Sequence, residues 1–240
     1  MELSIVVPVH NESENLRSLI EEIEAAVKGQ GAHEIIYVDD GSSDDTLARL
    51  TQLKQDFPAL RVLHHKNCCG QSAAVRTGIR AAKGRVIATL DGDGQNDPAS
   101  IPAMLAAWRE LDASSSRGAM VAGYRKKRKD TGWRKLSSRI ANGIRASLLR
   151  DETPDTGCGL KVFGRELFLE FPYFDHMHRF LPALAQRAGG KVVSVEVNHR
   201  PRTLGQSKYG TWGRLWVGIW DIMGVMWLQR RAHIAEVEER

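Results

Sequence analysis

Apolar residues along the chain follow two spacings. Some form short continuous runs rich in β-branched residues, as in buried strands, and others recur every third or fourth position, as on one face of a helix. We therefore predict strands at 3–9, 34–38, 61–64, 86–90, 119–123 and 191–197. We predict helices at 16–27, 71–82, 101–111, 133–148, 168–174 and 180–188, with a further one around Leu47, Leu50 and Leu53. Strands that alternate with helices favour a parallel, doubly wound α/β sheet.

The turn after the first strand has its own local signals. Pro8 is expected to stop the strand. Asn11, with Glu14 three residues on, has the spacing of a capping box and is expected to begin the following helix.

Two of the predicted strands end in acidic residues. Asp39-Asp40 follows the second strand, and Asp91-Gly92-Asp93-Gly94 follows the strand at 86–90. Open α/β folds bind ligands at the carboxyl edge of the sheet, and alternate residues of extended chain point the same way. Asp91 and Asp93 can therefore converge on one cation, and their oxygen ligands suit Mg²⁺ or Mn²⁺ beside a phosphate. A polar Asp-Gly turn without a ligand is the alternative.

The composition is that of an ordinary globular protein. Of 240 residues, 42% are hydrophobic and 26% are charged, and the formal net charge is +5. This length fits one large α/β domain or a domain with an appendage. The three cysteines form neither a paired framework nor a metal-binding spacing, which indicates a reducing compartment. No signal peptide or ordinary transmembrane helix is expected, because a strand begins at once and no apolar run reaches roughly 18 residues.

Dinucleotide binding is the first alternative for such a half-domain. It requires G-x-G-x-x-G between the first strand and helix, where this chain has Pro8-Val-His-Asn-Glu-Ser13. Acids at the strand ends favour instead a nucleotide held by its base and ribose, with its phosphates on a metal ion.

Three segments carry a resemblance to a known family. They are Pro8-Val-His-Asn-Glu-Ser-Glu-Asn-Leu16, Val38-Asp-Asp-Gly-Ser-Ser-Asp-Asp-Thr46 and Leu90-Asp-Gly-Asp-Gly-Gln-Asn-Asp-Pro98. In order and spacing they resemble the signatures of family 2 glycosyltransferases, which have the GT-A fold, a mostly parallel sheet flanked by helices. The resemblance implies a set of nucleotide-binding residues: Pro8, His10, Asn11, Glu12, Asp39, Asp40 and Asp91.

The metal site and the subfamily follow from the same resemblance. Asp91 and Asp93 would hold the metal ion on the donor pyrophosphate. Gln95 is similar to the third metal contact of polyprenyl-phosphate glycosyltransferases, including dolichyl-phosphate mannose synthase. His10 departs from the tyrosine usual at its position. The segment Pro-Val-x-Asn-Glu resembles that of bacterial relatives and slightly favours a uridine donor nucleotide over a guanosine one.

Basic residues gather in the second half of the chain. The loop Gly123-Tyr-Arg-Lys-Lys-Arg-Lys-Asp130 contains Arg125, and the amphipathic helix at 133–148 is also basic. Leu136-Ser-Ser-Arg-Ile-Ala-Asn142 within that helix resembles the segment of lipid-phosphate synthases that bears an acceptor-site arginine, here Arg139. No nucleic-acid-binding motif accompanies these charges, so we expect an anionic membrane surface as partner and no nucleic acid.

Two later loops extend the resemblance. Asp155-Thr-Gly-Cys-Gly-Leu-Lys161 looks like the D-x-x-x-G segment of the subfamily, which lies near the sugar and the acceptor. Asp155 is therefore a candidate base or sugar-hydroxyl contact. The R-x-x-G-x-S-K loop of the subfamily is matched at Arg202, Gly205, Ser207 and Lys208, with a polar turn as the alternative.

The tail at 212–228 is rich in tryptophan, but Arg214 and Asp221 interrupt it. This pattern favours a helix lying in the membrane interface over one that spans it. The alternative is a helix that packs on the domain or on a partner, either a second copy or a small integral-membrane protein. We therefore expect a GT-A domain at 1–210, a membrane-surface amphipathic helix at 211–231 and a polar tail at 232–240, on the cytoplasmic face of the membrane.

The resemblance implies transfer of a sugar from a nucleoside diphosphate to a polyprenyl monophosphate. Direct attack by the acceptor phosphate would invert the anomeric carbon without a strong general base. The residues expected to act in catalysis are Asp93, Asp155, Arg125, Arg139, Arg202 and Lys208. Two other classes stay open: a family 2 enzyme with a sugar acceptor, and a membrane- or nucleic-acid-binding protein without activity.

Overall fold

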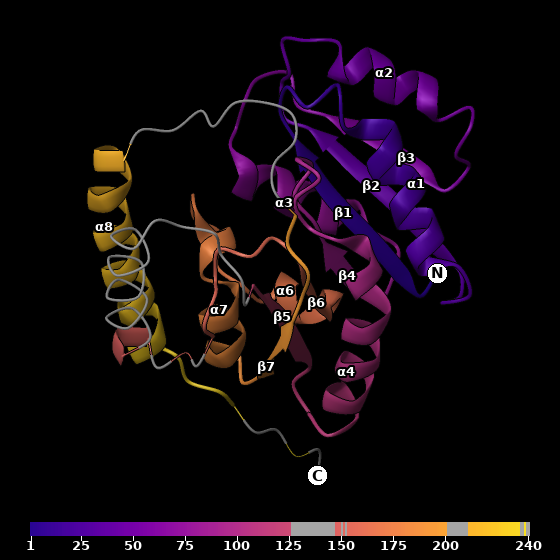
Figure 1. Ribbon diagram of the computed structural model, residues 1–240. Coiled ribbons are helices and arrows are strands. Elements are labelled where there is room, and N and C mark those ends of the chain that lie inside the picture. The colour runs from indigo at the N-terminus through magenta and orange to yellow at the C-terminus, as the bar shows by residue number, and fades with distance from the viewer. Residues whose placement is uncertain (126–146, 150, 152, 201–210, 236–237, 239–240) are drawn as a thin grey trace.

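The computed structural model describes residues 1–125, 147–149, 151, 153–200, 211–235 and 238, with the backbone alone for 211–216. Its centre is a seven-stranded sheet in the order β3-β2-β1-β4-β6-β5-β7 (Figure 1). The strands are β1 (Leu3–Val9), β2 (His33–Asp39), β3 (Leu60–His64), β4 (Val86–Thr89), β5 (Ala119–Tyr124), β6 (Lys161–Gly164) and β7 (Lys191–Glu196). The α-helices are α1 (Leu16–Val27), α2 (Thr46–Leu53), α3 (Gln71–Ala81), α4 (Ile101–Ala113), α6 (Arg165–Leu169), α7 (Leu181–Arg187) and α8 (Thr211–Arg230). Two 3₁₀ turns are η1 (Pro98–Ser100) and η2 (Met177–Arg179).

Alternation along β1 explains why helices cover both faces of the sheet. Ile5 and Val7 belong to the core cluster that includes the buried residues of α1, α2 and α4. Val6 points the other way, into the cluster formed with α3, α6 and α7. Because successive side chains of a strand face opposite sides, one apolar run supplies both cores.

One strand of the sheet is antiparallel to its neighbours. β6 runs antiparallel to both of its neighbours, β4 and β5, while the other pairs are parallel. The insertion of β6 beside β4 brings the loop before Lys161 to the end of β4. This mixed sheet, mostly parallel and flanked by helices, is the predicted fold class.

Three local predictions were wrong. Pro8 lies within β1, beyond Val6, the last residue of β1 paired with β4. Its missing N–H points toward that unpaired side, so it removes no hydrogen bond of the sheet. Asn11 does not cap a helix: it has a φ of 56°, and α1 begins only at Leu16.

The predicted helix at 168–174 is the third error, because α6 ends at Leu169. The aromatic spacing that suggested a helix comes from a packed turn, in which the ring centroids of Phe168 and Phe171 lie 5.5 Å apart. Pro172 disfavours the helical conformation of the residue before it.

Helix α8 stands at the edge of the molecule beside α7 (Figure 1). Its buried Val225 packs on the α7 side of the core, and the Arg187 side chain donates a hydrogen bond to the Leu228 carbonyl at 3.0 Å. One face of α8 therefore packs on the domain, as in the alternative considered above. A second face exposes apolar side chains, namely Val217, Ile219, Trp220, Met223 and Trp227. No helix in the described parts of the chain has both the length and the apolar content needed to cross a bilayer.

Several predictions lie outside the described residues. They include most of the basic helix at 133–148, of which only 147 and 148 are described, as helix, and the whole loop at 202–208. Arg139, Arg202 and Lys208 therefore have no described position.

Candidate functional site

The loops after β1 and β2 are joined to each other at the carboxyl edge of the sheet. The backbone N–H of Asn11 donates to Ser42 Oγ at 2.9 Å, and Asn11 Oδ1 accepts from the Ser43 N–H at 2.7 Å. His10 Nδ1 lies 2.8 Å from the carbonyl oxygen of Asp40. The left-handed backbone at Asn11 suits asparagine, which tolerates this region better than most residues. Asn11 therefore positions the loop that follows Asp39 and Asp40.

Glu12 and Pro8 occupy the same turn. The Glu12 N–H donates to Thr46 Oγ1 at 3.0 Å at the start of α2, and the Glu12 carboxylate accepts from Asn15 Nδ2 at 3.1 Å. Pro8 is half-buried at the end of β1. The predicted nucleotide-binding residues of this loop thus share one edge with Asp39.

Asp39, at the end of β2, is fully buried, and its carboxylate is turned toward β3. Its Oδ2 lies 2.7 Å from His64 Nδ1, and its Oδ1 accepts a hydrogen bond from the Ser42 N–H at 3.4 Å. The His64 side chain is 38% exposed. The pair therefore links a buried acid to the surface beside the loop of Asn11.

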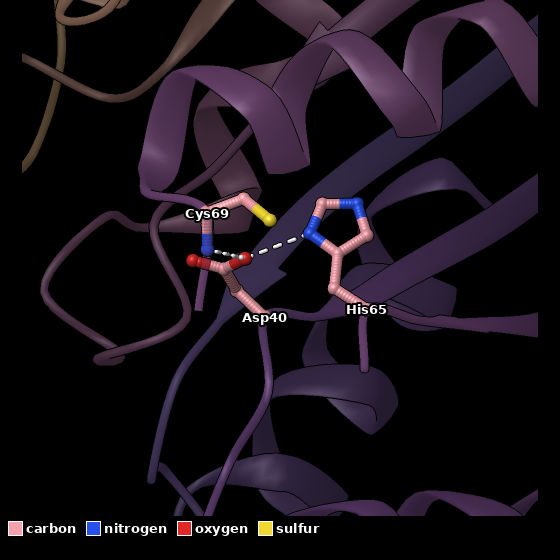
Figure 2. A group of neighbouring side chains, drawn as sticks. All are labelled: Asp40, His65 and Cys69. Atoms are coloured by element: carbon pink, nitrogen blue, oxygen red, sulfur yellow. Dashed lines mark hydrogen bonds and ion pairs between the residues drawn. The ribbon is translucent and has the colours of Figure 1, made fainter. Parts of the chain in front are cut away.

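Asp40 organises the loop that leads into α3 (Figure 2). Its Oδ1 accepts hydrogen bonds from His65 Nδ1 at 2.7 Å and the Cys69 N–H at 2.8 Å. Its Oδ2 accepts from the Gly70 N–H at 2.8 Å and the Cys68 thiol at 3.3 Å. Burial acts to raise the pKa of Asp40, but these hydrogen bonds outweigh it and hold the pKa below its usual range. Both oxygens of Asp40 are thus engaged by the protein.

Asp91 follows β4 and faces α3. Its Oδ1 accepts a hydrogen bond from Gln71 Nε2 at 2.8 Å, and its N–H donates to Asn96 Oδ1 at 3.0 Å. Burial, together with the charge of Asp93, raises the pKa of Asp91 to about 6, against the lowering effect of Lys161 and Arg125. The positive groups of the protein therefore do not fully offset the cost of a negative charge on Asp91.

The residues of this turn fit a hard divalent cation. Asp93 Oδ1 accepts from the Gln95 N–H at 3.1 Å, so the turn places both acids and Gln95 in one short loop. A divalent cation would relieve the repulsion that raises the pKa of Asp91, and carboxylate and amide oxygens are suitable ligands for Mg²⁺ or Mn²⁺. Asp91, Asp93 and Gln95 are the residues that would hold it.

Cationic side chains lie beside these acids. Arg125, directly after β5, binds Asp155 in a bidentate pair, with Nε 2.5 Å from Oδ2 and Nη2 2.9 Å from Oδ1. The two side chains are only 11% and 13% exposed. Arg125 is close enough to Asp91 to lower its pKa. The structure therefore brings two residues of the predicted catalytic set, Arg125 and Asp155, to the turn of Asp91 and Asp93.

Lys161 is a site residue that we did not predict. It is 3% exposed at the start of β6, and its Nζ donates to the carbonyl oxygens of Cys158 and Thr156, the latter at 3.4 Å. Burial lowers the pKa of Lys161, although the nearby acids favour its charge. A charged residue at the first position of an otherwise apolar strand was the available signal.

The segment that precedes the predicted 202–208 loop is anchored to the turn that contains Asp91, Asp93 and Gln95. The Arg200 N–H donates to the Gln95 carbonyl at 2.9 Å. The Arg200 guanidinium binds Asp97 at 2.8 Å and Glu22 at 2.6 Å. The chain thus enters residues 201–210 from the edge of the site.

Comparison with known sequences places the chain in a family. Residues 4–171 match the model of glycosyl transferase family 2. The chain is 37% identical over 237 residues to a dodecaprenyl-phosphate galacturonate synthase of Rhizobium johnstonii, covering 96% of this chain and 68% of the relative. It is 35% identical over 211 residues to an undecaprenyl-phosphate 4-deoxy-4-formamido-L-arabinose transferase of an Enterobacter species, covering 86% of this chain and 62% of the relative. The chain therefore spans about two thirds of the length of these relatives.

Solved structures share the fold at lower identity. Glucosyl-3-phosphoglycerate synthase of M. tuberculosis, in complex with Mn²⁺, UDP-glucose and phosphoglyceric acid, has a TM-score of 0.61 at 19% identity, covering 98% of this chain and 81% of that chain. A mannosyltransferase of Pyrobaculum calidifontis, in complex with GDP-Man and Mn²⁺, has a TM-score of 0.65 at 18% identity, covering 86% of this chain and 58% of that chain. These neighbours bear out the predicted GT-A fold. With a family match across well over half its length, the chain belongs to glycosyl transferase family 2.

Proposed function

We propose that the protein transfers a sugar from a nucleoside diphosphate to a polyprenyl monophosphate, with a divalent cation bound at Asp91, Asp93 and Gln95. The observation that carries this proposal is the meeting of two kinds of group at one edge of the sheet. Asp91, with its raised pKa, offers a place for a cation, and Arg125 and Lys161 lie beside it as sites for anions. The polyprenyl-phosphate acceptor is supported by the printed activities of the two relatives.

The donor would lie across the joined loops after β1 and β2. Asp39, whose two oxygens are bonded to His64 and to the Ser42 N–H, would act on the base or ribose through His64 and the loop that Asn11 positions. Asp40 would act through the loop at 65–70, because both of its oxygens are engaged there. The solved neighbours bind either a uridine or a guanosine nucleotide, so the proposal specifies a nucleoside diphosphate and not its base. Mg²⁺ or Mn²⁺, when bound, would offset the charge that grows on the leaving diphosphate.

The acceptor phosphate needs orientation more than deprotonation. It is already an anion near neutral pH, so direct attack with inversion requires no strong base. Arg125 offers a guanidinium suited to forked phosphate contacts, and Asp155 fixes its orientation through two hydrogen bonds. This pairing favours a positioning role for Asp155 over that of a base. Arg139, Arg202 and Lys208 would complete the acceptor site.

The exposed face of α8 would hold the enzyme on the cytoplasmic face of a membrane. Trp220 and Trp227 are 69% and 59% exposed, and tryptophan is suited to the headgroup region. The basic Arg230 and Arg231 follow at the end of the helix, and each would contribute about 1 kcal/mol near an anionic surface. A small integral-membrane partner or a second copy of the chain would be the other occupants of this face.

The function is tested by incubating the purified protein with a panel of UDP- and GDP-sugars, Mn²⁺ and a polyprenyl phosphate in detergent. A labelled lipid that forms with one donor, and that the Asp93→Asn variant does not form, supports the proposal. Labelled sugar transferred to a free saccharide instead would favour the sugar-acceptor alternative. Vesicle binding with no transfer from any donor would favour a protein without activity.

A further inference from the structure

Three chemically different ligands meet beside β2, away from the turn of Asp91 and Asp93. Asp40, His65 and Cys69 each offer one ligand atom, and these atoms lie within 4.8 Å of one another. Figure 2 shows the Cys69 sulfur and the His65 ring on the same side of the Asp40 carboxylate. The three residues come from the end of β2, the end of β3 and the loop before α3. Within the described residues, this is the one group of three or more His, Cys, Asp or Glu side chains whose ligand atoms lie this close together.

The hydrogen bond between Asp40 and His65 can be exchanged for metal bonds without leaving a partner unsatisfied. The Cys69 thiol donates to the Asn67 carbonyl at 3.3 Å, and Asn67 is exposed, so water can take the place of that donor. Asp40 Oδ1 has two contacts, His65 Nδ1 and the Cys69 N–H. A carboxylate only accepts, so neutral His65 carries its proton on Nδ1 in this arrangement. A cation bound to both Oδ1 and Nδ1 would replace that proton, and Oδ1 would keep two partners. The 2.7 Å contact between the two atoms would open to about 3.3 Å, the separation of two ligands of a tetrahedral zinc-class ion. Oδ2 would keep its own two, the Gly70 N–H and the Cys68 thiol.

The displaced proton has a place to go. His65 Nε2 lies 3.0 Å from Thr77 Oγ1, and a hydroxyl can either donate or accept. When Nδ1 binds a cation, the ring proton moves to Nε2 and is donated to Thr77. Metal-binding histidines commonly donate their second nitrogen in this way, which fixes the ring and its tautomer. The Cys69 thiol loses its own proton to solvent when it binds the ion. Binding of each ion at neutral pH therefore releases one proton.

We propose that Asp40, His65 and Cys69 form a second cation site, selective for a borderline-soft divalent ion of the zinc class. The mixed oxygen, nitrogen and sulfur ligands suit Zn²⁺, Co²⁺ or Cd²⁺, whereas the oxygen ligands of Asp91, Asp93 and Gln95 suit Mg²⁺ or Mn²⁺. Cys69 is exposed, so an ion can enter from solvent and water can complete its coordination. The neighbouring Cys68 is not in the ligand set, because its thiol contacts the other oxygen of Asp40 at 3.3 Å.

A cation at this second site would also stabilise the loop before α3. Asp40 holds the amides of Cys69 and Gly70, and the next residue, Gln71, donates to Asp91. A bound ion would add the Cys69 side chain and His65 to the contacts that fix this loop. The site itself does not depend on the proposed glycosyl transfer.

The test uses Co²⁺ as a spectroscopic probe on the tag-free full chain, in reductant and millimolar Mg²⁺ to occupy the oxygen site. Thiolate binding gives a near-ultraviolet sulfur-to-cobalt charge-transfer band, which ions at carboxylate sites do not produce. We expect the band to saturate at one equivalent of Co²⁺ and to disappear when one equivalent of Zn²⁺ is added. The variants are Cys69→Ser and His65→Gln, and the matched control is Cys68→Ser, which changes the adjacent exposed thiol.

Cys69→Ser should abolish the band, His65→Gln should weaken binding at least 100-fold, and Cys68→Ser should leave both band and affinity unchanged. Thr77→Val, which removes the partner of Nε2, should weaken Co²⁺ binding roughly 10–100-fold. Melting curves of each variant without metal establish that it is folded. If Cys69→Ser is not folded, Cys69→Ala replaces it. The absence of a band at one equivalent, or a band that depends on Cys68 instead of Cys69, would overturn the proposal.

Discussion

The Arg125 guanidinium and the Asp155 carboxylate are joined by two hydrogen bonds, of 2.5 and 2.9 Å, that connect the end of β5 to the loop before β6. We expect Arg125→Ala to raise the apparent KM for the lipid or to lower kcat, with nucleotide affinity kept. Asp155→Asn should produce a smaller change in the same direction, because it loosens the guanidinium without removing it.

Kinetics with a varied lipid concentration and titration with nucleoside diphosphate separate the two effects. Arg109→Ala, an exposed arginine on α4, is the control and should change neither. An equal loss of nucleotide affinity in Arg125→Ala would instead assign this residue to the donor.

The acids of the metal-binding turn should be essential for turnover and dispensable for folding. Asp93→Asn keeps the shape of the side chain but removes its charge, so activity should fall on the order of 100-fold or more. EDTA should have a comparable effect on the unmodified protein, reversed by added Mn²⁺. Turnover that survives both treatments would show that the assignment of the metal site is wrong. Asp112→Asn, in α4, is a matched control on the surface of the domain.

Burial of His178 should make the protein less stable in acid. Its Nδ1 lies 2.8 Å from the hydroxyl of buried Ser72, and burial lowers the pKa of His178 to about 3. Between pH 6.5 and 3 the unfolded chain therefore takes up a proton that the folded chain refuses, so the free energy of unfolding falls as the pH falls. The slope is about 1.4 kcal/mol per pH unit, and the contribution is complete above pH 6.5.

Urea unfolding from pH 7.5 to 4.5 measures this slope. His178→Asn keeps a group that can bond to Ser72 but does not titrate, so its stability should vary less with pH. His233→Asn, at an exposed histidine, is the control and should leave the slope of the free energy of unfolding against pH unchanged. Parallel pH profiles for His178→Asn and the unmodified protein would contradict a buried neutral histidine.

The exposed face of α8 should control membrane binding. The double variant Trp220→Glu, Trp227→Glu removes two large apolar side chains and adds two negative charges, so vesicle affinity should fall on the order of 100-fold. Sedimentation with anionic vesicles measures the affinity, and Leu169→Glu, an exposed leucine on α6, serves as the control. If vesicle binding were unchanged and a dimer dissociated instead, this face would be a contact between copies.

The strands and most helices could be predicted because the pattern that specifies them is local. Leu16, Ile20 and Ile23 follow helical spacing, and all three are buried in α1. Asn11 could not be read in the same way, because its partners, Ser42 and Ser43, lie about 30 residues away along the chain. A capping spacing and a left-handed turn look alike in sequence when the deciding contacts are distant.

The candidate site could be proposed from sequence where its residues lie in one motif, and not where the fold brings distant residues together. Asp91, Asp93 and Gln95 fall within five positions and were predicted as a group. Lys161 reaches them only because β6 enters the sheet antiparallel beside β4, which no local pattern indicates. The grouping of Cys69 with Asp40 likewise depends on β2 and β3 ending at the same edge.

The close contact between Gly159 and Asp91 limits how this protein can vary. A Cβ built on Gly159 would lie 2.2 Å from Asp91 Oδ2 and 2.3 Å from Asp91 Cγ. The backbone at Gly159 therefore packs directly against the Asp91 carboxylate and closes that side of it to a cation or a phosphate. Even alanine at position 159 would push the acid out of place, so a methyl group there should be as harmful to the site as the loss of a charge.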